Sequence, residues 1–422
     1  MTTKLEMPPE RDDCEEPVTG MTSAETPGPA PVLLSDQSVI CFAKDWSEDP
    51  TSNNHVMTEL SKFGRVLWLN SVSTRRPSLT SGRDVGKIFK KLAGFFRGAT
   101  RINDTFWVFT PLVLPLPHSR WAAAVNRFVL AWTLRVLRWR LGLKKDFQLW
   151  TFLPTVNDYI RSLGGSVLVY YCTDEWSKFN YVNGSRVADD ERRLCERADI
   201  VFATARGLVE SKGRWNSETH HAPHGVDHEL FSKALDSSLP VPADIQSLKR
   251  PLIGFYGTLQ DWVDLELIAY LAGRRPEWSI VLIGTALVDL APILKFPNVH
   301  YLGRKPHDML PGYCKEFSVG MLPQKVNQLT LHMNPIKLRE YLCAGLPVVS
   351  VALPEVVAYS HLCSVARTYQ EFEAAVALAI STDSAEKRRQ RSDLMKTETW
   401  QKRVEDLRMH VSRVKEAKCR KR

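Results

Sequence analysis

A lysine and a glutamate lie one helical turn apart in the stretch NPIKLREYLCAGLPVVS, residues 334–350. Asn334 can cap a helix there, and Pro335 suits its first position. Free backbone N–H groups at the start of a helix form a site for a phosphate, to which Lys337 would add a positive charge. Glu340 could accept two hydrogen bonds from a ribose diol. The alternative is an ordinary ion pair on the surface of a well-capped helix.

A second candidate group follows an apparent strand in VYYCTDEWSKF, residues 169–179. Open α/β sheets place ligand loops at the carboxyl ends of their strands, so Asp174 could accept the proton of a substrate hydroxyl as a general base. Its alternative role is to cap a helix. Asp45, in the loop after the first strand, is a weaker candidate base. His55, at the start of the first helix, could contact a substrate or simply lie on the surface.

Three histidines lie close together in the chain, at positions 220, 221 and 224. A metal site would need tighter ligand spacing and an acidic or cysteine partner beside them, and neither is present. We therefore expect no metal at these histidines.

These candidates must be positioned by a layered α/β framework. Short apolar runs alternate with helical spacing along most of the chain, and most of the runs are continuous rather than alternating, which is typical of parallel strands covered on both faces. The expected strands cover residues 39–43, 65–70, 166–171, 199–204, 219–226, 250–257, 278–284, 299–303, 317–323 and 346–352. About five strands fall in each half, on either side of a Pro- and Ser-containing segment near residues 224–250.

The pattern predicts an α/β protein with two doubly wound, Rossmann-like domains that face each other across a cleft. We expect a disordered tail over residues 1–30, because it is rich in Pro, Glu, Thr and Ser and poor in large apolar residues. The first domain is expected over residues 31–224 and the second over 225–392. A helix and a basic tail would follow over 393–422.

The amino-acid composition indicates the class of protein to which the chain belongs. The chain has 422 residues, 44% of them hydrophobic and 24% charged, which suits a folded protein of two domains. It contains no apolar run long enough to cross a membrane and no secretory signal at its start. The eight cysteines are scattered and form no CxxC pair, so they are expected to be reduced thiols in the cytoplasm.

The formal charge of +9 gathers in amphipathic segments of the first half and near the end of the chain. Residues 84–101 are basic and aromatic, and residues 120–145 combine three Trp with Lys and Arg and no acidic residue. Such segments could lie on a membrane surface, or their apolar faces could simply belong to the core. Nucleic acid is a less favoured partner, because no recognised binding motif accompanies the charge.

Residues 334–350, the preceding stretch LGRKPHDMLPGYCKEFSVGMLP (302–323) and GFYGTLQDWVDLELIAYLAGRRPEWSIVLIG (254–284) together resemble the donor-binding half of GT-B glycosyltransferases. The similarity is to the large retaining family that uses nucleotide-diphosphate sugars, of the bacterial polysaccharide and teichuronic-acid type. It spans roughly residues 38–400 and is most specific between 250 and 356. HGVD, residues 224–227, resembles the segment between the two domains of this family.

The resemblance implies roles for individual residues. Lys337 would contact the donor diphosphate, Glu340 the ribose, and Gly257 and Thr258 the loop that approaches the phosphates and sugar. Asn334 would open the phosphate-facing helix. No cofactor or metal is implied, since the helix dipole and the lysine balance the charge of the diphosphate.

One departure concerns the transferred sugar. Many members carry a second glutamate eight positions before the one that matches Glu340, and this chain has His332 there. Either the sugar contacts are reorganised through Asn327, Thr330 or His332, or the preferred donor differs. His332 could also be simply a polar loop residue. Asp174 corresponds to an acidic residue found near this place in related enzymes.

The implied function is transfer of a sugar to a hydroxyl of a glycan or lipid-linked, polyprenyl-type acceptor in surface polysaccharide assembly. The protein would work in the cytoplasm, at the inner face of the membrane if the basic aromatic segments bind lipid. A sugar-nucleotide epimerase on the same fold and a non-catalytic nucleotide-sugar-binding protein are the alternatives. A dinucleotide oxidoreductase is disfavoured, because no GxGxxG follows a strand.

Overall fold

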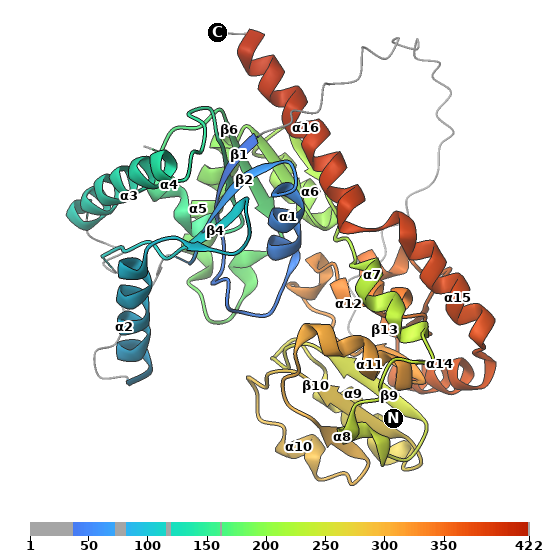
Figure 1. The fold of residues 1–422 in the computed structure, drawn as a ribbon. Coiled ribbons are helices and arrows are strands. Elements are labelled where there is room, and N and C mark those ends of the chain that lie inside the picture. Colours follow the sequence, from blue (N-terminus) through green and yellow to red (C-terminus); the bar gives the residue numbers. More distant parts are fainter. Residues whose placement is uncertain (1–36, 72–81, 115–119, 161–162, 421–422) are drawn as a thin grey trace, which may run out of the picture.

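The computed structural model describes residues 37–71, 82–114, 120–160 and 163–420. Their strands form two separate sheets with helices packed around each, so the chain has two α/β domains (Figure 1). The two-domain doubly wound fold expected from the sequence is confirmed. The tail expected over residues 1–30 lies outside the described residues.

The first sheet has eight strands in the order β3-β4-β2-β1-β5-β6-β7-β8. All neighbours are parallel except β3 and β4. Ile40 pairs with Leu67 on one side and Leu149 on the other, which fixes the register at the centre. The strands are β1 (Gln37–Phe42), β2 (Gly64–Leu69), β3 (Thr100–Arg101), β4 (Phe106–Phe109), β5 (Gln148–Thr151), β6 (Val167–Cys172), β7 (Ile200–Ala203) and β8 (Thr219–His221).

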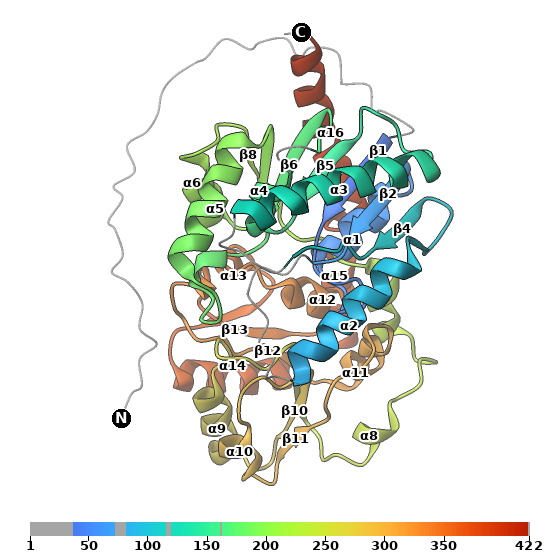
Figure 2. The same cartoon turned by 90° about the vertical axis from the view of Figure 1, so that its left-hand side faces the viewer.

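Helices cover both faces of this sheet. One face packs against α1 (Ser52–Leu60) and α16 (Trp400–Arg420), so a segment from the far end of the chain completes the first core. The other face packs against α3 (Arg120–Arg140), α4 (Asn157–Ile160), α5 (Gly184–Arg197) and α6 (Arg206–Gly213). A further helix, α2 (Gly82–Arg97), projects from the same side as α3 (Figure 2).

The second sheet is parallel, in the order β11-β10-β9-β12-β13-β14. Its strands are β9 (Leu252–Tyr256), β10 (Ser279–Ile283), β11 (Val299–Tyr301), β12 (Val319–Leu322), β13 (Val348–Val351) and β14 (Ser364–Ala366). Its longer helices are α9 (Leu265–Arg274), α11 (Leu310–Glu316), α12 (Ile336–Cys343), α14 (Tyr369–Thr382) and α15 (Ala385–Leu394). The short helices are α7 (His228–Phe231), α8 (Ala243–Gln246), α10 (Ala291–Leu294) and α13 (Pro354–Val357).

The expectation of about five strands in each half was too low. The sequence pattern missed β3, β4, β5 and β14, which have only two to four residues each. In β5, the sequence QLWT begins and ends with polar residues, although all four are buried. A run of four residues that mixes polar and apolar side chains shows no clear hydrophobic period. Its place in the sheet therefore depends on the strands that pair with it.

The two sheets face each other through the carboxyl ends of their strands. Thr204 follows β7 and accepts a hydrogen bond from Asn334, while Glu355, after β13, accepts one from the backbone N–H of Arg206. The chain passes between the domains twice at one place, where Val226 forms a parallel bridge with Thr399. The carboxyl ends of the strands of both sheets therefore meet at the junction between the domains.

Candidate functional site

The second sheet reverses its strand order between β9 and β12, and the candidate site lies at this reversal. In open α/β sheets, ligands bind outside the carboxyl ends of the strands at such a point. Gly257 follows β9 directly and has φ 149°, a conformation that favours glycine. A Cβ added there would lie 3.9 Å from the side chain of Lys337, so the backbone at Gly257 and this lysine are neighbours.

Lys337 and Glu340, both on α12, form an ion pair of 3.1 Å between Nζ and Oε2. Lys337 Nζ also lies 5.2 Å from the ring centre of Tyr256, at the end of β9. His307, after β11, brings its Nε2 within 3.6 Å of Glu340 Oε1. Elements that are distant in sequence thus converge on one buried carboxylate.

The charge of Glu340 is maintained by its neighbours. Burial favours the neutral acid, but Lys337 and then His307 outweigh it and hold the pKa of Glu340 at about 2. In the described part of the chain, two buried atoms here make no hydrogen bond, His307 Nε2 and the hydroxyl of Tyr256, while Glu340 Oε2 is held by its ion pair with Lys337. Buried polar atoms normally have partners, so this cluster is typical of a site that receives a ligand.

The expected helix cap at Asn334 is wrong. Helix α12 begins at Ile336, and no side chain caps it. The Asn334 side chain donates instead to the carbonyl of Thr204 at 2.7 Å and accepts from Arg339 at 2.8 Å. The backbone N–H groups at the start of α12 are therefore not occupied by a capping side chain, while Asn334 ties this helix to the first domain.

The loop before α12 contains the other expected donor-site residues. Asn327 accepts hydrogen bonds from the backbone of Leu329 and Thr330, and the buried hydroxyl of Thr330 donates to the carbonyl of Lys325 at 2.6 Å. These two side chains shape the loop. Thr258, by contrast, is exposed beside Gly257.

His332 lies at the domain boundary. Its Nδ1 is 3.0 Å from the carbonyl oxygen of Gln328, and a Cβ added at Gly207 of α6 would come within 2.9 Å of the imidazole ring. The ring therefore packs closely on the first domain.

Asp174 follows β6 on the opposite wall. Burial raises the pKa of its carboxyl, and Thr173 partly offsets this. The adjacent Glu175 is held in place by Lys212 at 2.9 Å, and Lys212 also contacts Glu191 at 2.8 Å. No contact joins Asp174 to the Lys337–Glu340 pair in the part of the chain that the structure describes. Asp45, the weaker candidate, accepts two hydrogen bonds from Ser71 and holds a loop.

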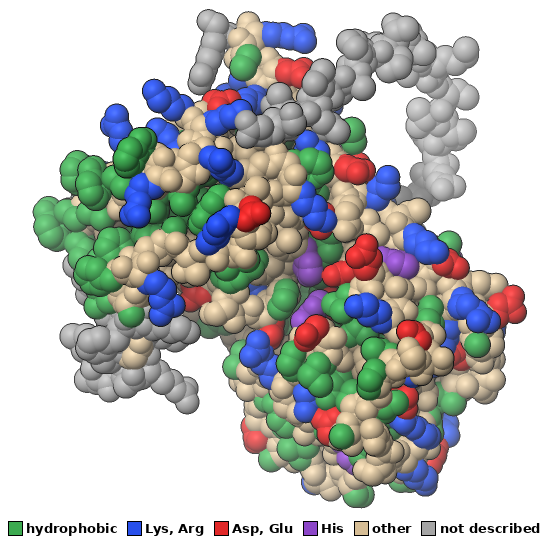
Figure 3. All heavy atoms as spheres, in the orientation of Figure 1, with side chains coloured by type: hydrophobic (Ala, Val, Ile, Leu, Met, Phe, Trp, Pro, Cys, Tyr) green, Lys and Arg blue, Asp and Glu red, His purple; other side chains and the backbone are tan. Residues whose placement is uncertain are grey.

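Sequence reasoning missed His307 and underrated His55. The rings of these two histidines lie 5.9 Å apart, and His55 stacks on Trp400 at 5.0 Å. Burial, with His307 nearby, lowers the pKa of His55 to about 4, so the first domain presents a neutral imidazole beside Glu340. Histidine side chains are visible at the junction of the two domains (Figure 3). The only sequence signal for His307 is its position just after an expected strand.

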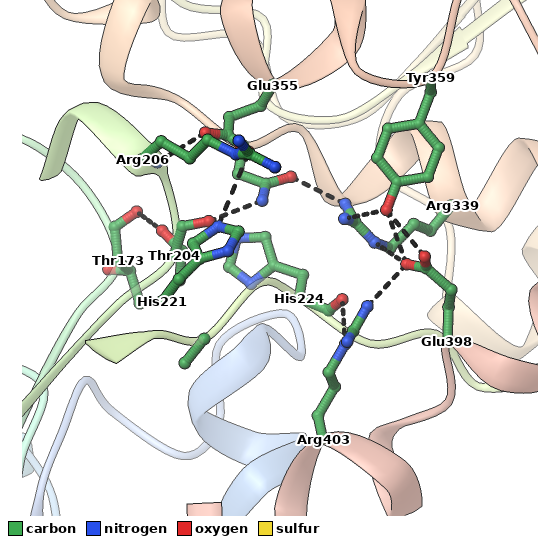
Figure 4. Close-up of polar contacts among 12 residues, drawn as sticks. Thr173, Thr204, Arg206, His221, His224, Arg339, Glu355, Tyr359, Glu398 and Arg403 are labelled. Atoms are coloured by element: carbon green, nitrogen blue, oxygen red, sulfur yellow. Dashed lines mark hydrogen bonds and ion pairs between the residues drawn. The ribbon is translucent and has the colours of Figure 1, made fainter. Parts of the chain in front are cut away.

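A hydrogen-bonded network connects the two walls behind α12 (Figure 4). Thr204 donates to the carbonyl of Thr173, next to Asp174, and accepts from Asn334. Arg339 then bonds to Asn334, Glu398 and Tyr359, and Arg403 joins Glu398 to the carbonyl of His224. Arg339, Tyr359 and Glu398 of this network also line a pocket, together with Arg206, His221 and Glu355. The lining of this pocket does not include Glu340.

The three histidines that lie close together in the chain each contact a different residue. His220 contacts Glu218, His221 lies 3.8 Å from Glu355, and the buried His224 packs against Trp400. Among the described residues, no group of three or more His, Cys, Asp or Glu could hold a metal ion.

Known proteins resemble this chain in part of its sequence and in its fold. No family model matches the chain. The chain is 28% identical over 205 residues to TuaH of Bacillus subtilis (strain 168), described as a teichuronic acid biosynthesis glycosyltransferase. This match covers 44% of the chain and 51% of TuaH, so it spans about half the length of that relative.

Solved structures show the same two-domain architecture. Sucrose-phosphate synthase from Thermosynechococcus elongatus aligns with a TM-score of 0.64 and 13% identity, over 88% of this chain and 97% of that one. HepE of Anabaena, in complex with UDP and glucose, aligns with a TM-score of 0.61 and 11% identity, over 87% and 98%. A UDP-forming trehalose-phosphate synthase from Burkholderia vietnamiensis gives 0.61 and 13%, over 91% and 98%. The resemblance inferred from the sequence is confirmed.

Proposed function

Since the chain has the two-domain GT-B fold of nucleotide-sugar glycosyltransferases, we propose that it transfers a sugar from a nucleotide-diphosphate donor to an acceptor hydroxyl. The observation that carries the proposal is the group of Lys337, Glu340 and His307 at the strand-order reversal of the second sheet. It combines a cation, the free start of a helix and a buried carboxylate that is paired with this cation and lies beside His307.

In the proposed reaction, the bond between the anomeric carbon and the diphosphate breaks, and a bond to the acceptor oxygen forms. Negative charge grows on the leaving diphosphate, where Lys337 and the N–H groups of α12 would stabilise it. Donor binding would turn Lys337 from Glu340 toward the phosphates. Glu340, still beside His307, would then accept hydrogen bonds from the ribose hydroxyls. Gly257 lets the backbone approach the phosphates, with Thr258 beside it.

The first domain would supply the acceptor side. Asp174 is our proposed base, because a carboxyl whose pKa is raised by burial holds a proton more readily than an exposed one. Its backbone neighbour Thr173 is linked through Thr204 to Asn334, which provides a physical connection between the acceptor loop and the donor helix. Asn334 therefore acts as a positioning residue rather than a cap.

The transferred sugar would contact the loop that contains Asn327, Thr330 and His332. The side chains of Asn327 and Thr330 are engaged within the loop, so they would act by shaping it. His332, in contact with the first domain, would contact the sugar only in a cleft that opens around Gly207.

For the acceptor, we propose the hydroxyl of a glycan or lipid-linked glycan in surface polysaccharide assembly, at the cytoplasmic face of a membrane. The support is the similarity to TuaH. A sugar-nucleotide epimerase and a non-catalytic binding protein are the alternatives. Incubation with donor alone tests for the epimerase, which would produce an epimerised nucleotide sugar without transfer. Incubation of donors with acceptors tests for the binding protein, which would leave every donor unchanged.

Calorimetry tests the donor-site assignment by comparing the affinity for a nucleoside diphosphate, UDP, with the affinity for its nucleoside, uridine. Other nucleotides are then tested in the same way. Lys337→Ala should weaken diphosphate binding by about tenfold to a hundredfold, with little effect on the nucleoside, because the lost cation faces the phosphates. Glu340→Ala should weaken both ligands. Lys295→Ala, at an exposed lysine that contacts Phe296, is the matched control and should bind normally. Unchanged affinity in both site variants would reject the assignment.

A further inference from the structure

Four aromatic side chains form a stripe along the outer face of α3. They are Trp121, Phe128, Trp132 and Trp139, with exposed fractions of 68%, 74%, 63% and 83%. Their spacing of seven, four and seven residues keeps them on one face of a helix. The side chains that α3 buries, among them Leu130, Leu134 and Leu137, lie on the opposite face, against the first sheet.

This stripe is not explained by the core, because the core already uses the other face of α3. Large apolar side chains scattered singly on a surface are ordinary, but four aromatic rings along one helix form a contiguous patch. Figure 3 shows hydrophobic side chains gathered at the left edge of the molecule, over α3, with Lys and Arg among them. The stripe is therefore an exposed apolar patch that packing of the core does not account for.

The charged side chains of α3 are all positive. Helix α3 contains no Asp or Glu. Arg135 lies within the stripe, while Arg127 and Arg140 lie beside it, and none of these three forms an ion pair with a described residue. Arg138 faces the ring of Phe147 at 5.6 Å. A partner must therefore accept aromatic rings and positive charges together.

We infer that the outer face of α3 docks on the surface of an anionic lipid bilayer. Tryptophan prefers the interface between headgroups and acyl chains, and arginine beside it meets anionic headgroups. None of the described helices is long and apolar enough to span a membrane, so α3 would lie in the plane of the interface. Phe96 is also exposed and belongs to α2, the helix that projects from the same side of the first domain as α3 (Figure 2).

A second copy of the chain fits the stripe less well. A symmetric dimer through α3 would bring the arginines of two identical helices together, with no acidic residue on either helix to neutralise them. A bilayer containing phosphatidylglycerol supplies the missing negative charge. The docking inference stands on α3 alone, while its consequence, that the acceptor is an amphiphile presented from the membrane surface, rests on the proposed function.

The test is co-sedimentation of the full chain with vesicles of phosphatidylcholine alone or with phosphatidylglycerol added. Binding should require the anionic lipid and weaken at high salt, because the arginine contribution is screened. The double variant Trp132→Ala/Trp139→Ala should reduce the partition constant about tenfold or more, and Arg135→Glu should reduce it on anionic vesicles. Leu378→Ser, which removes an apolar side chain that is 60% exposed on the second domain, is the matched control and should bind normally.

Circular dichroism and nucleotide affinity, measured on every variant, separate loss of docking from loss of fold or donor site. Vesicle binding unaffected by the α3 substitutions would overturn the inference. So would a dimer in sedimentation velocity that the tryptophan substitutions convert to monomer while lipid binding persists. Nucleotide binding that survives failed docking leaves the proposed function standing, and docking without nucleotide binding rejects the function alone.

Discussion

Glu340 is a buried carboxylate whose charge depends on two side chains from different elements. Lys337 comes from the same helix and His307 from a 3-10 turn that follows β11, and together they lower its pKa from 4.5 to about 2 despite burial. The folded protein therefore holds this proton less tightly than the unfolded chain does. The resulting stability is fully present above about pH 4.5 and is lost as pH falls toward about 2.

Glu340→Gln should accordingly lower the free energy of unfolding at neutral pH by about 3 kcal/mol, the amount that corresponds to this shift. The gap between variant and parent should shrink as the pH is lowered from about 5 toward about 2.5, where the parent loses the same contribution. Urea unfolding at several pH values measures it. Glu277→Gln, at an exposed carboxylate, serves as control. A gap that stays constant over this range would contradict the role given to the ionised form.

Part of this residue cluster was accessible from the sequence. Lys337 and Glu340 share a helix, so their spacing alone predicts that they meet. The contact of His307 with Glu340, and of His55 with His307, depends on how separate strand ends and separate domains come together, which no local period reports. Asn334 was misassigned for the same reason: its amide finds a carbonyl in the other domain rather than its own helix end.

Among the elements, α16 contributes more than its basic, polar sequence indicates. Trp400 is only 2% exposed and stacks on His55, while Val404, Leu407 and Val411 pack in the core beneath the first sheet. The opposite holds for α3, which exposes its aromatic residues. The sequence predicted an amphipathic segment over residues 120–145 and a helix with a basic tail over 393–422, but only the packed structure shows which apolar faces are covered.

Trp400→Ala should therefore destabilise the first domain by about 3–5 kcal/mol, as expected for loss of a large buried aromatic side chain. Trp139→Ala, which truncates a side chain of the same type that is 83% exposed, should change stability by less than about 0.5 kcal/mol. Hydrogen exchange in the strands of the first sheet distinguishes a local effect from a global one. Equal losses in the two variants would show that α16 does not complete this core.

Across the whole molecule, the cleft is bridged at its rim. Arg304 contacts Asp49 at 2.7 Å, Asn180 contacts Asp261 at 2.5 Å, and Phe179 packs edge-on against Trp262 at 5.9 Å. Each contact joins one domain to the other, so the described conformation is closed. The two chain crossings at Val226 and Thr399 lie at the junction about which opening would occur.

Asp49→Arg should favour an open form, because it places two like charges across the cleft, whereas Asp49→Arg combined with Arg304→Glu should restore closure. Small-angle scattering would show a larger radius of gyration for the single variant at low salt and a smaller difference at high salt. Asp393→Lys, which reverses an exposed ion pair within one region of the second domain, is the control and should leave the dimensions unchanged. Identical radii for all variants would show that this pair does not influence closure.

The architecture was the most predictable level. Apolar runs such as LIGFY and SIVLI identify buried parallel strands, because both faces of such strands are covered. The two residues of β3 show no period and were missed, and β14 was also missed, although β11, which has three residues as well, lay within an expected strand. The pairing of α16 with the first sheet was also beyond local patterns, because it joins residues more than three hundred positions apart in the chain, such as Val56 and Val411.

That pairing has a consequence for synthesis on the ribosome. Proteins made as successive domains commonly fold in the order in which the domains emerge. Here, the first domain waits for residues 400–420 to cover one face of its sheet. Until they emerge, Val39, Val66 and Val169 lack part of their packing, so the second domain can mature before the first. For this chain, the order of completion is the reverse of the order of translation.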